Sequence, residues 1–307
     1  MNKSFSWDNE TDRCRIGATH ITRIVDLDRQ AFEPKIIFPA ATGEVMQKKT
    51  ANLNDHNFDQ NTLALFLSFH AYLVRIKNKT ILVDMCLGND KTRIERPIWH
   101  QRNGPFIENL KNAGVEPTDV DYVMCTHLHA DHVGWNTKLL NGEWVPTFPN
   151  AEYIFSEKEY NHWRREDGRY SSGEQILHGS FHDSVMPIIS SGQARLVPSN
   201  FNLGNGVHLE PAYGHTPGNI MIHIEDCQEH AVLCGDILHH PIQLGHPEWK
   251  TNFCSDPEQA TLTRLNFLRE YADTKTAILP AHFHSGDLGL ISKDNGSYVL
   301  NKKLNTK

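Results

Sequence analysis

The stretch CTHLHADHVGWN, residues 125–136, places three histidines and an aspartate within six residues. It follows VDYVM, which reads as a buried strand because it combines β-branched and aromatic residues. Polar and charged groups that crowd the end of a buried strand must be desolvated and paired. The fold must therefore bring the histidines at the end of this strand together around a shared partner.

Within this stretch, His127 and His129 lie two residues apart, so in an extended segment both imidazoles point to the same side. They can therefore reach one metal ion. Asp131 and His132 follow after the chain turns and can face a second point nearby. A lone HxH pair would be weak evidence in a chain with 19 histidines, whereas the complete HxHxDH run is typical of a metal site.

Three more apolar strands each end in one metal-capable side chain. His215 lies in AYGHTPGN, where glycine and proline fix a tight turn. Asp236 closes AVLCGD, and His282 closes the strand in AILPAHF. Four apolar strands thus each end in such groups, and we expect the three later ones to complete the coordination shell begun by the first cluster.

Five histidines and two aspartates form a mixed nitrogen and oxygen donor set, which suits Zn²⁺ best and also Mn²⁺, Fe²⁺ or Co²⁺. A set without cysteine is not a closed structural zinc site, and seven ligands exceed what one tetrahedral ion uses. We therefore predict two divalent ions. The predicted assignment is His127, His129 and His215 on the first ion, Asp131, His132 and His282 on the second, and Asp236 as the bridge.

The rest of the chain predicts interleaved strands and helices, and hence an α/β or α+β fold with layered sheets. Residues 63–76 and 79–88 read as a hairpin, residues 105–113 as a helix that stops at Gly114, and residues 256–273 as a second helix. Residues 1–60 are polar and less regular. We expect them to form an N-terminal elaboration, either a lid or a dimer arm, on a hydrolase domain of residues 61–307.

Charge and hydropathy limit the kinds of molecule that this protein can bind. The net charge of −7 is spread without long acidic or basic runs, which argues against nucleic acid or an anionic membrane. The amino terminus has no apolar core of a signal peptide, and no apolar run approaches the roughly 18 residues of a membrane span. We therefore expect a cytoplasmic protein that acts on a small-molecule substrate, with a homodimer as an open alternative to the monomer. The six cysteines are scattered along the sequence, and we expect them to be reduced thiols.

The motifs THLHADH, GHTPGN, CGD and PAHF, in this order and spacing, resemble the metal-binding motifs of the metallo-β-lactamase superfamily across roughly residues 65–290. The resemblance implies a four-layer αββα sandwich with a dinuclear site at one edge. It also implies the same division of ligands between two ions. Asp236 stands where true β-lactamases of this fold commonly carry cysteine. We therefore do not expect antibiotic hydrolysis to be the main activity.

The chain is most similar to the lactonase and methyl parathion hydrolase-like branch. Acyl-homoserine lactonases of that branch carry a tyrosine three residues after the bridging aspartate, and here that position is His239. Trp135 replaces the second glycine of the family's frequent HxGGN motif. Aromatic residues expected near the mouth of the site, either in contact with substrate or in the core, are Phe69, Trp99, Phe106, Trp135 and Phe283.

Two divalent ions lower the pKa of a water that bridges them toward neutrality. Hydroxide is therefore the expected nucleophile on a lactone or other ester. We predict Asp131 and His239 as catalytic residues. Asp131 would hydrogen-bond the hydroxide and shuttle its proton, and His239, with His240 and His284 as alternatives, would protonate the leaving group. Open alternatives are a mononuclear iron oxidoreductase similar to sulfur dioxygenases, a thioesterase similar to glyoxalase II, and a metal-stabilised binding module.

Overall fold

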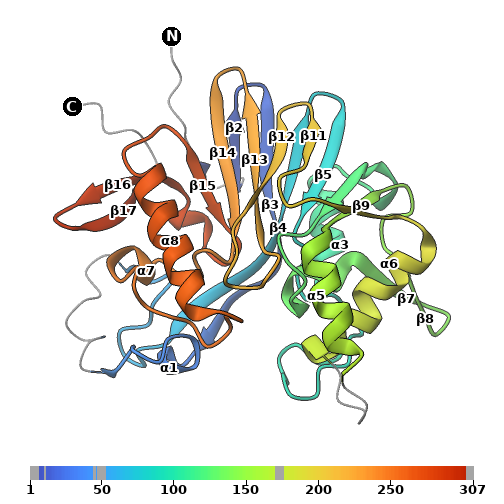
Figure 1. Cartoon of the computed structure of the whole chain (residues 1–307), viewed down its shortest axis with the longest axis horizontal. Helices are drawn as coiled ribbons and strands as arrows, with labels where there is room; N and C mark the ends of the chain where they lie inside the picture. Colours follow the sequence, from blue (N-terminus) through green and yellow to red (C-terminus); the bar gives the residue numbers. More distant parts are fainter. Residues whose placement is uncertain (1–6, 10–11, 44–45, 47–52, 170–175, 302–307) are drawn as a thin grey trace.

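The computed structural model describes residues 7–9, 12–43, 46, 53–169 and 176–301, whose strands form two large sheets and one hairpin (Figure 1). The eight-stranded sheet contains, in spatial order, β1 (Trp7–Asp8), β2 (Arg13–Ile16), β3 (Thr19–Phe32), β4 (Leu65–Ile76), β5 (Lys79–Val83), β6 (Tyr122–Met124), β9 (Glu152–Ser156) and β10 (Ala194–Val197). The seven-stranded sheet contains β11 (Asn202–Gly204), β12 (Val207–Pro211), β13 (Ile220–Asp226), β14 (Glu229–Gly235), β15 (Ala277–Pro280), β16 (Gly289–Asp294) and β17 (Ser297–Asn301). The separate hairpin pairs β7 (Thr137–Leu140) with β8 (Glu143–Pro146).

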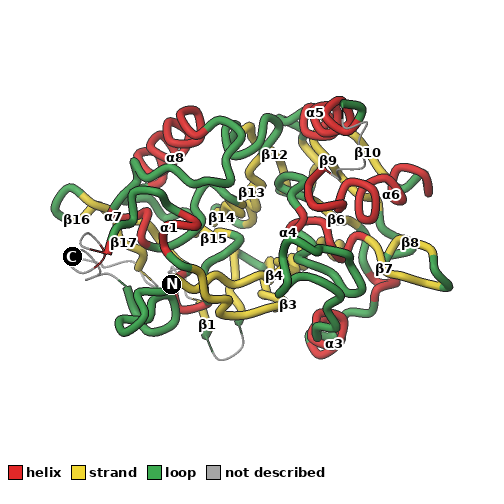
Figure 2. The backbone as a smooth tube through the Cα atoms, turned by 90° about the horizontal axis from the view of Figure 1, so that it is seen from below, coloured by secondary structure: helices red, strands yellow, loops and turns green. Residues whose placement is uncertain are grey.

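The helices lie mainly outside the two sheets (Figures 1 and 2). They are α1 (Pro34–Ile37), α3 (Phe106–Asn112), α4 (Ala130–Val133), α5 (Glu157–Asp167), α6 (Met186–Ser191), α7 (Ile242–Gly245) and α8 (Pro257–Tyr271). Short 3-10 segments are η1 (Pro117–Asp119), η2 (Gly134–Asn136), η3 (Ile176–Gly179) and η5 (Ser285–Asp287), and η4 (Phe181–Val185) is a π turn. In Figure 1, α8 lies on the side of the seven-stranded sheet, while α3, α5 and α6 lie on the side of the eight-stranded sheet.

Side-chain alternation explains why the eight-stranded sheet sits inside the molecule. Along β4, Tyr72 and Val74 face the apolar cluster between the two sheets, while Ala71 and Leu73 face the outer cluster beside α3 and α6. A strand that is apolar on both faces must be covered on both faces, which a sheet packed on another sheet and under helices provides. The expected αββα sandwich is confirmed.

Strand direction brings several strand ends to one edge. β5, β6, β9 and β10 run parallel to one another, and β14 runs parallel to β15 in the second sheet. The carboxyl ends of parallel neighbours lie at the same edge of a sheet. Seen from below, α4, which directly follows the segment after β6, lies near the middle of the molecule, where the two sheets meet (Figure 2).

The expected hairpin and both expected helices are confirmed as β4 with β5, α3, and α8, and Gly114 with φ +75° follows the end of α3. The expectation of irregular structure before residue 60 is wrong for residues 13–32. β2 and β3 are there, and β3 pairs with most of β4. Polar residues of these strands alternate with buried positions such as Ile21, so a half-buried strand has the average composition of a polar segment.

The roles expected for the N-terminal region, lid or dimer arm, stay predictions, as do the boundary at residue 60 and homodimerisation. Residues 1–6, 10–11, 44–45 and 47–52 lie outside the described residues. In the part of the chain that the structure describes, no helix is both long and apolar enough to span a bilayer.

Candidate metal centre

All seven predicted ligands come together at the edge where the two sheets meet. His127 and His129 follow β6, and Asp131 and His132 lie in α4. The second sheet contributes His215 after β12, Asp236 directly after β14 and His282 after β15. Their ligand atoms fall into overlapping groups in which all atoms lie within 4.8 Å of one another.

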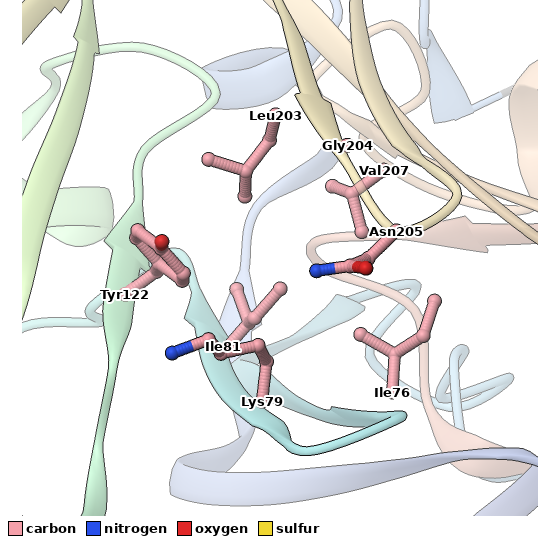
Figure 3. A pocket seen from close by; sticks show the side chains of 8 residues that line it. All are labelled: Ile76, Lys79, Ile81, Tyr122, Leu203, Gly204, Asn205 and Val207. Carbon is pink, nitrogen blue, oxygen red and sulfur yellow. The ribbon is translucent and has the colours of Figure 1, made fainter.

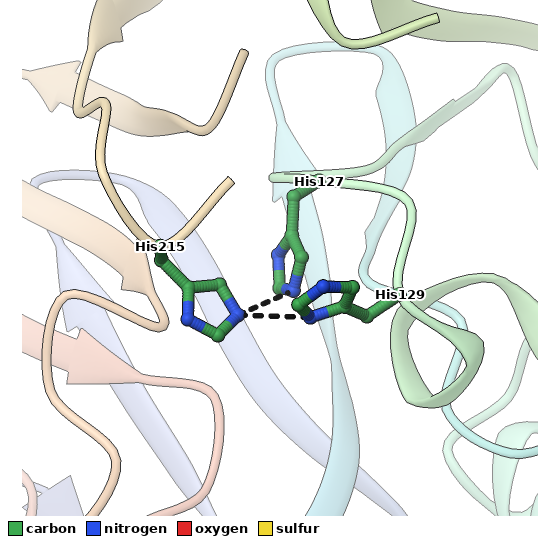
Figure 4. A group of neighbouring side chains, drawn as sticks. All are labelled: His127, His129 and His215. Carbon is green, nitrogen blue, oxygen red and sulfur yellow. Dashed lines mark hydrogen bonds between the residues drawn. The ribbon is translucent and has the colours of Figure 1, made fainter. Parts of the chain in front are cut away.

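The first group consists of His127, His129 and His215 (Figure 4). Nε2 of His215 lies 3.1 Å from Nε2 of His127 and 2.9 Å from Nδ1 of His129. Oδ2 of Asp236 lies 3.2 Å from the same nitrogen of His215. Donor atoms on one tetrahedral Zn²⁺ are about 3.3 Å apart, given Zn–N bonds of roughly 2.0–2.1 Å. The first group therefore has the spacing of a tetrahedral ligand set.

The second group consists of Asp131, His132 and His282. Nε2 of His132 lies 3.8 Å, and Nε2 of His282 3.6 Å, from Oδ2 of Asp131. The other carboxylate oxygen of Asp236, Oδ1, is 3.3 Å from Nε2 of His132 and 3.1 Å from Nε2 of His282. Asp236 therefore turns one oxygen to each group, as a bridging ligand would.

The charges of these residues fit a bound cation. Oδ1 of Asp236 and Nε2 of His132 are buried and have no hydrogen-bond partner. Burial lowers the pKa of His132, but the carboxylates of Asp236, Asp84 and Asp131 outweigh it and raise this pKa well above its usual value. The carboxylates thus favour positive charge at this point. Together with the nitrogen and oxygen donors, this environment fits two divalent ions.

Asp84 belongs to the centre and was missed by the sequence reasoning. Oδ2 of Asp84 lies 3.0 Å from Nδ1 of His132, and the carboxylate accepts hydrogen bonds from the backbone N–H and the hydroxyl of Thr126. Such a partner holds the imidazole so that its other nitrogen faces the ion. The signal was present, because Asp84 follows the apolar strand β5 just as Asp236 follows β14.

Other partners orient further imidazoles. Nδ1 of His282 lies 3.1 Å from the carbonyl oxygen of Ser68, and Nδ1 of His215 lies 3.4 Å from Sγ of Cys254. In both histidines the opposite nitrogen, Nε2, points toward Asp236. These contacts fix the ring orientation before any ion binds.

The three histidines considered as proton donors differ in position. His239 is buried in the centre, with Nε2 3.3 Å from Oδ2 of Asp236 and with both ring nitrogens free of hydrogen-bond partners. Burial lowers the pKa of His239 to about 4. In His240, Nε2 is hydrogen-bonded to the carbonyl oxygen of Asn57, and Nδ1 accepts a hydrogen bond from the backbone N–H of Ile242. His284 stacks on His56 and faces Asp28 instead.

The aromatic residues expected near the mouth also separate. Phe69 packs edge-on against His282, with ring centroids 5.1 Å apart, and Trp99 packs against Phe69 in turn. Phe106 and Trp135 stack on each other inside the outer apolar cluster, and Phe283 is buried in the cluster between the sheets. Phe69 is therefore a buried residue that supports His282 from behind, Trp99 is partly buried against it, and the other three residues belong to the other two apolar clusters.

A recess at the other end of β4, β5 and β6 carries no comparable chemistry (Figure 3). It is lined mainly by aliphatic side chains, together with Lys79, Tyr122 and Asn205. Nζ of Lys79 is already paired with Asp121 at 2.7 Å. The metal-capable groups at the opposite edge remain the candidate site.

Comparison with known proteins agrees with this geometry. The family model described as "Metallo-beta-lactamase superfamily" matches residues 67–282. The chain belongs to this superfamily. It is a metal-dependent hydrolase, and the resemblance to the lactonase-like branch is confirmed by its relatives.

An N-acyl homoserine lactonase from Bacillus sp. is 27% identical over 58% of this chain and 68% of its own length. N-acyl homoserine lactonase AiiA from Bacillus thuringiensis subsp. kurstaki is 26% identical over 55% of this chain and 63% of its own length. The chain thus spans about two thirds of the length of these curated relatives.

Two solved structures share the fold over almost the whole chain. The hydrolase AbOPH, of the beta lactamase superfamily, superimposes with a TM-score of 0.77 at 23% identity and covers 97% of both chains. AidC, a dizinc quorum-quenching lactonase, has a TM-score of 0.75 at 20% identity and covers 98% of this chain and 99% of its own. At such identities the likeness establishes the fold.

Proposed function

We propose that this protein hydrolyses a lactone or a related ester of a small molecule with two divalent ions, Zn²⁺ being the ion that best suits the donors. The observation that carries the proposal is the placement of Asp236. Its two carboxylate oxygens face two separate ligand sets, so one residue serves both. A single ion would leave the second set, Asp131, His132 and His282, without a function.

Two bound divalent ions supply Lewis acidity toward a carbonyl oxygen and acidify the attacking water. The chain itself provides the proton handling. Asp131 lies beside both His132 and His282, so its carboxylate is placed to accept a hydrogen bond from the attacking water. His239 can donate a hydrogen bond from Nε2 to the departing oxygen, because this nitrogen lies within the centre, 3.3 Å from Oδ2 of Asp236. His239 thereby occupies the place of the tyrosine found in the acyl-homoserine lactonases.

The substrate class follows from the relatives and from the surroundings of the centre. Curated relatives are named N-acyl homoserine lactonases, and AidC is described as a dizinc quorum-quenching lactonase in complex with a product, N-hexnoyl-L-homoserine. Trp99, which is partly buried and packs on Phe69, offers an apolar surface near His282. A site of apolar walls with a few polar groups suits a small organic ester, and the net charge of −7 disfavours nucleic acid.

Metal content per chain, measured by elemental analysis on freshly purified protein, tests the proposal together with a turnover screen. The screen contains lactones, aryl esters, thioesters and phosphotriesters. Two zinc-like ions with lactone or ester turnover are the expected result. One iron per chain without hydrolysis would overturn the proposal in favour of an oxidoreductase, and turnover of thioesters alone would replace the substrate class.

A further inference from the structure

Glu159 is a buried carboxylate outside the donor set that contacts both loops carrying the first group of ligands. It is the third residue of α5, and its side chain is 1% exposed. The helix start is fixed locally, because the hydroxyl of Ser156 accepts a hydrogen bond from the backbone N–H of Glu159. The capped first turn thus directs this carboxylate toward the metal centre rather than toward solvent.

The two oxygens of Glu159 bind different segments. Oε1 accepts hydrogen bonds from the backbone N–H of Leu128 at 3.2 Å and from Nε1 of Trp163 at 2.6 Å. Oε2 accepts one from the backbone N–H of Gly218 at 2.8 Å. Leu128 lies between His127 and His129 in the sequence, and Gly218 lies three residues after His215. One carboxylate therefore links the two loops that deliver all three histidines of the first group.

Only a carboxylate can serve in this arrangement. Both of its oxygens receive N–H donors, and an ionised carboxylate accepts at both. The amide nitrogen of a glutamine is a donor, so at one of the two positions it would face another N–H group. Charge-assisted hydrogen bonds are also shorter and stronger than neutral ones, which offsets the cost of burying Glu159.

Packing shows that the contact is tight on the side of the second loop. A Cβ atom placed on Gly218 would lie 2.2 Å from the backbone nitrogen of Glu159 and 2.6 Å from its Cβ. Only glycine lets this loop approach α5 so closely. Trp163, which binds Oε1, also lies beside the first group, with its ring centroid 5.9 Å from that of His129.

We propose that Glu159 is a positioning residue that sets the spacing of His127, His129 and His215 and thereby the affinity of the first ion. This inference rests on the proposed two-ion centre. The second group has supports that Glu159 does not touch, since Asp84 contacts His132 and the carbonyl oxygen of Ser68 contacts His282, while Asp84 also accepts hydrogen bonds from Thr126, next to His127. Removing the charge of Glu159 should therefore weaken one ion and spare the other.

The test uses the full-length, zinc-loaded protein and follows zinc release as the concentration of a competing chelator is raised. In Glu159→Gln, one of the two ions should leave at a 10- to 100-fold lower chelator concentration, about the size of effect known for partners of metal ligands. Glu157→Gln is the matched control, because Glu157 lies in the same helical turn and is exposed. This control should release both ions as the wild type does.

Cobalt substitution identifies the ion that is lost. The visible spectrum of cobalt-loaded Glu159→Gln at one ion per chain should match that of His129→Ala and differ from that of His282→Ala. If Glu159→Gln does not fold, as judged by circular dichroism, Trp163→Phe replaces it in both measurements. That variant removes one donor to Oε1, leaves an aromatic ring at position 163 and the charge of Glu159 in place, and should weaken the same ion to a smaller extent.

The outcomes separate this inference from the proposed function. If the wild type binds no ions, the proposed function fails and the role of Glu159 fails with it. If the wild type binds two ions but the variants release both ions as the wild type does, or weaken the two ions equally, Glu159 does not position the first group and the proposed function stands.

Discussion

Asp236 joins the two ligand groups through its two oxygens, Oδ2 on the side of His215 and Oδ1 on the side of His132 and His282. We expect Asp236→Ala to lose at least one ion per chain and to reduce kcat/KM by at least about 100-fold, since even partners of metal ligands contribute 10- to 100-fold. Elemental analysis and steady-state kinetics check this. Asp294→Ala, an exposed change on β16, is the control, and retention of both ions in Asp236→Ala would refute the bridge.

His239 and His240 are neighbours with different surroundings, which allows a paired prediction. His239→Asn should lower kcat by about 100-fold, within the range for a positioned proton donor, while both ions are retained. His240→Asn should leave kcat near the wild-type value and lower the free energy of unfolding by about 1–3 kcal/mol, because it disrupts buried hydrogen bonds. Kinetics, metal content and urea unfolding measure both. Loss of an ion in His239→Asn would make His239 a ligand instead.

At the scale of residues, the sequence contained the ligands but not their supports. That the seven candidate ligands lie together could be predicted, because they follow apolar strands and a strand end fixes where its next side chain lies. Asp84 follows the same rule, yet a single aspartate next to a strand gave no reason to pair it with His132. Glu159 gave no signal at all, since its partners, the N–H groups of Leu128 and Gly218, lie far away in the sequence.

At the scale of elements, three histidines form a ladder across β12, β13 and β14, away from the metal centre. The ring of His223 stacks on His208, with centroids 4.4 Å apart, and on His230, with centroids 5.1 Å apart. Burial, assisted by the two neighbouring imidazoles, lowers the pKa of His223 to about 3, although Glu210 lies 3.2 Å from its Nε2. The pKa of His230 is lowered as well, chiefly by burial. His223 therefore stays neutral in the folded state at mildly acidic pH.

The ladder predicts a loss of stability in acid. Unfolded histidine takes up a proton below a pKa of about 6.5, whereas His223 in the folded protein stays neutral down to about 3, so the unfolded state binds more protons between these values. The free energy of unfolding should fall as pH drops from about 6.5 toward 4, by up to about 1.4 kcal/mol per pH unit for one such group. His223→Phe should flatten this slope in urea unfolding followed from pH 7 to 4.

His20→Asn is the control for the ladder, since His20 is exposed on β3. It should leave the slope unchanged. An equally steep slope in His223→Phe would show that other groups cause the acid sensitivity.

The N-terminal strands show a further limit of predicting secondary structure from the sequence. β3 gains its stability from pairing with β4, which lies more than 30 residues later, and local composition does not reveal such a partner.

At the scale of the whole molecule, the ligands come from both sheets. The segments after β6 bring His127, His129, Asp131 and His132, and the second sheet brings His215, Asp236 and His282. The layered fold was predictable from alternating strands and helices, because each apolar face needs a cover. The order of strands within each sheet was not, since it depends on long-range pairing. Ions bound at this edge would connect the two sheets across the sandwich.

Metal removal should therefore lower the stability of the whole fold rather than loosen one loop. A ligand at about 1,000 times its Kd stabilises the folded state by about 4 kcal/mol, which corresponds to a shift in Tm on the order of 10 °C in chains of roughly this size. Scanning calorimetry before and after chelation, with zinc added back, measures the shift. Chelation should shift the Tm of Asp236→Ala much less, because that variant has already lost an ion. If chelation releases both ions from the wild type without changing its Tm, the ions do not connect the two sheets.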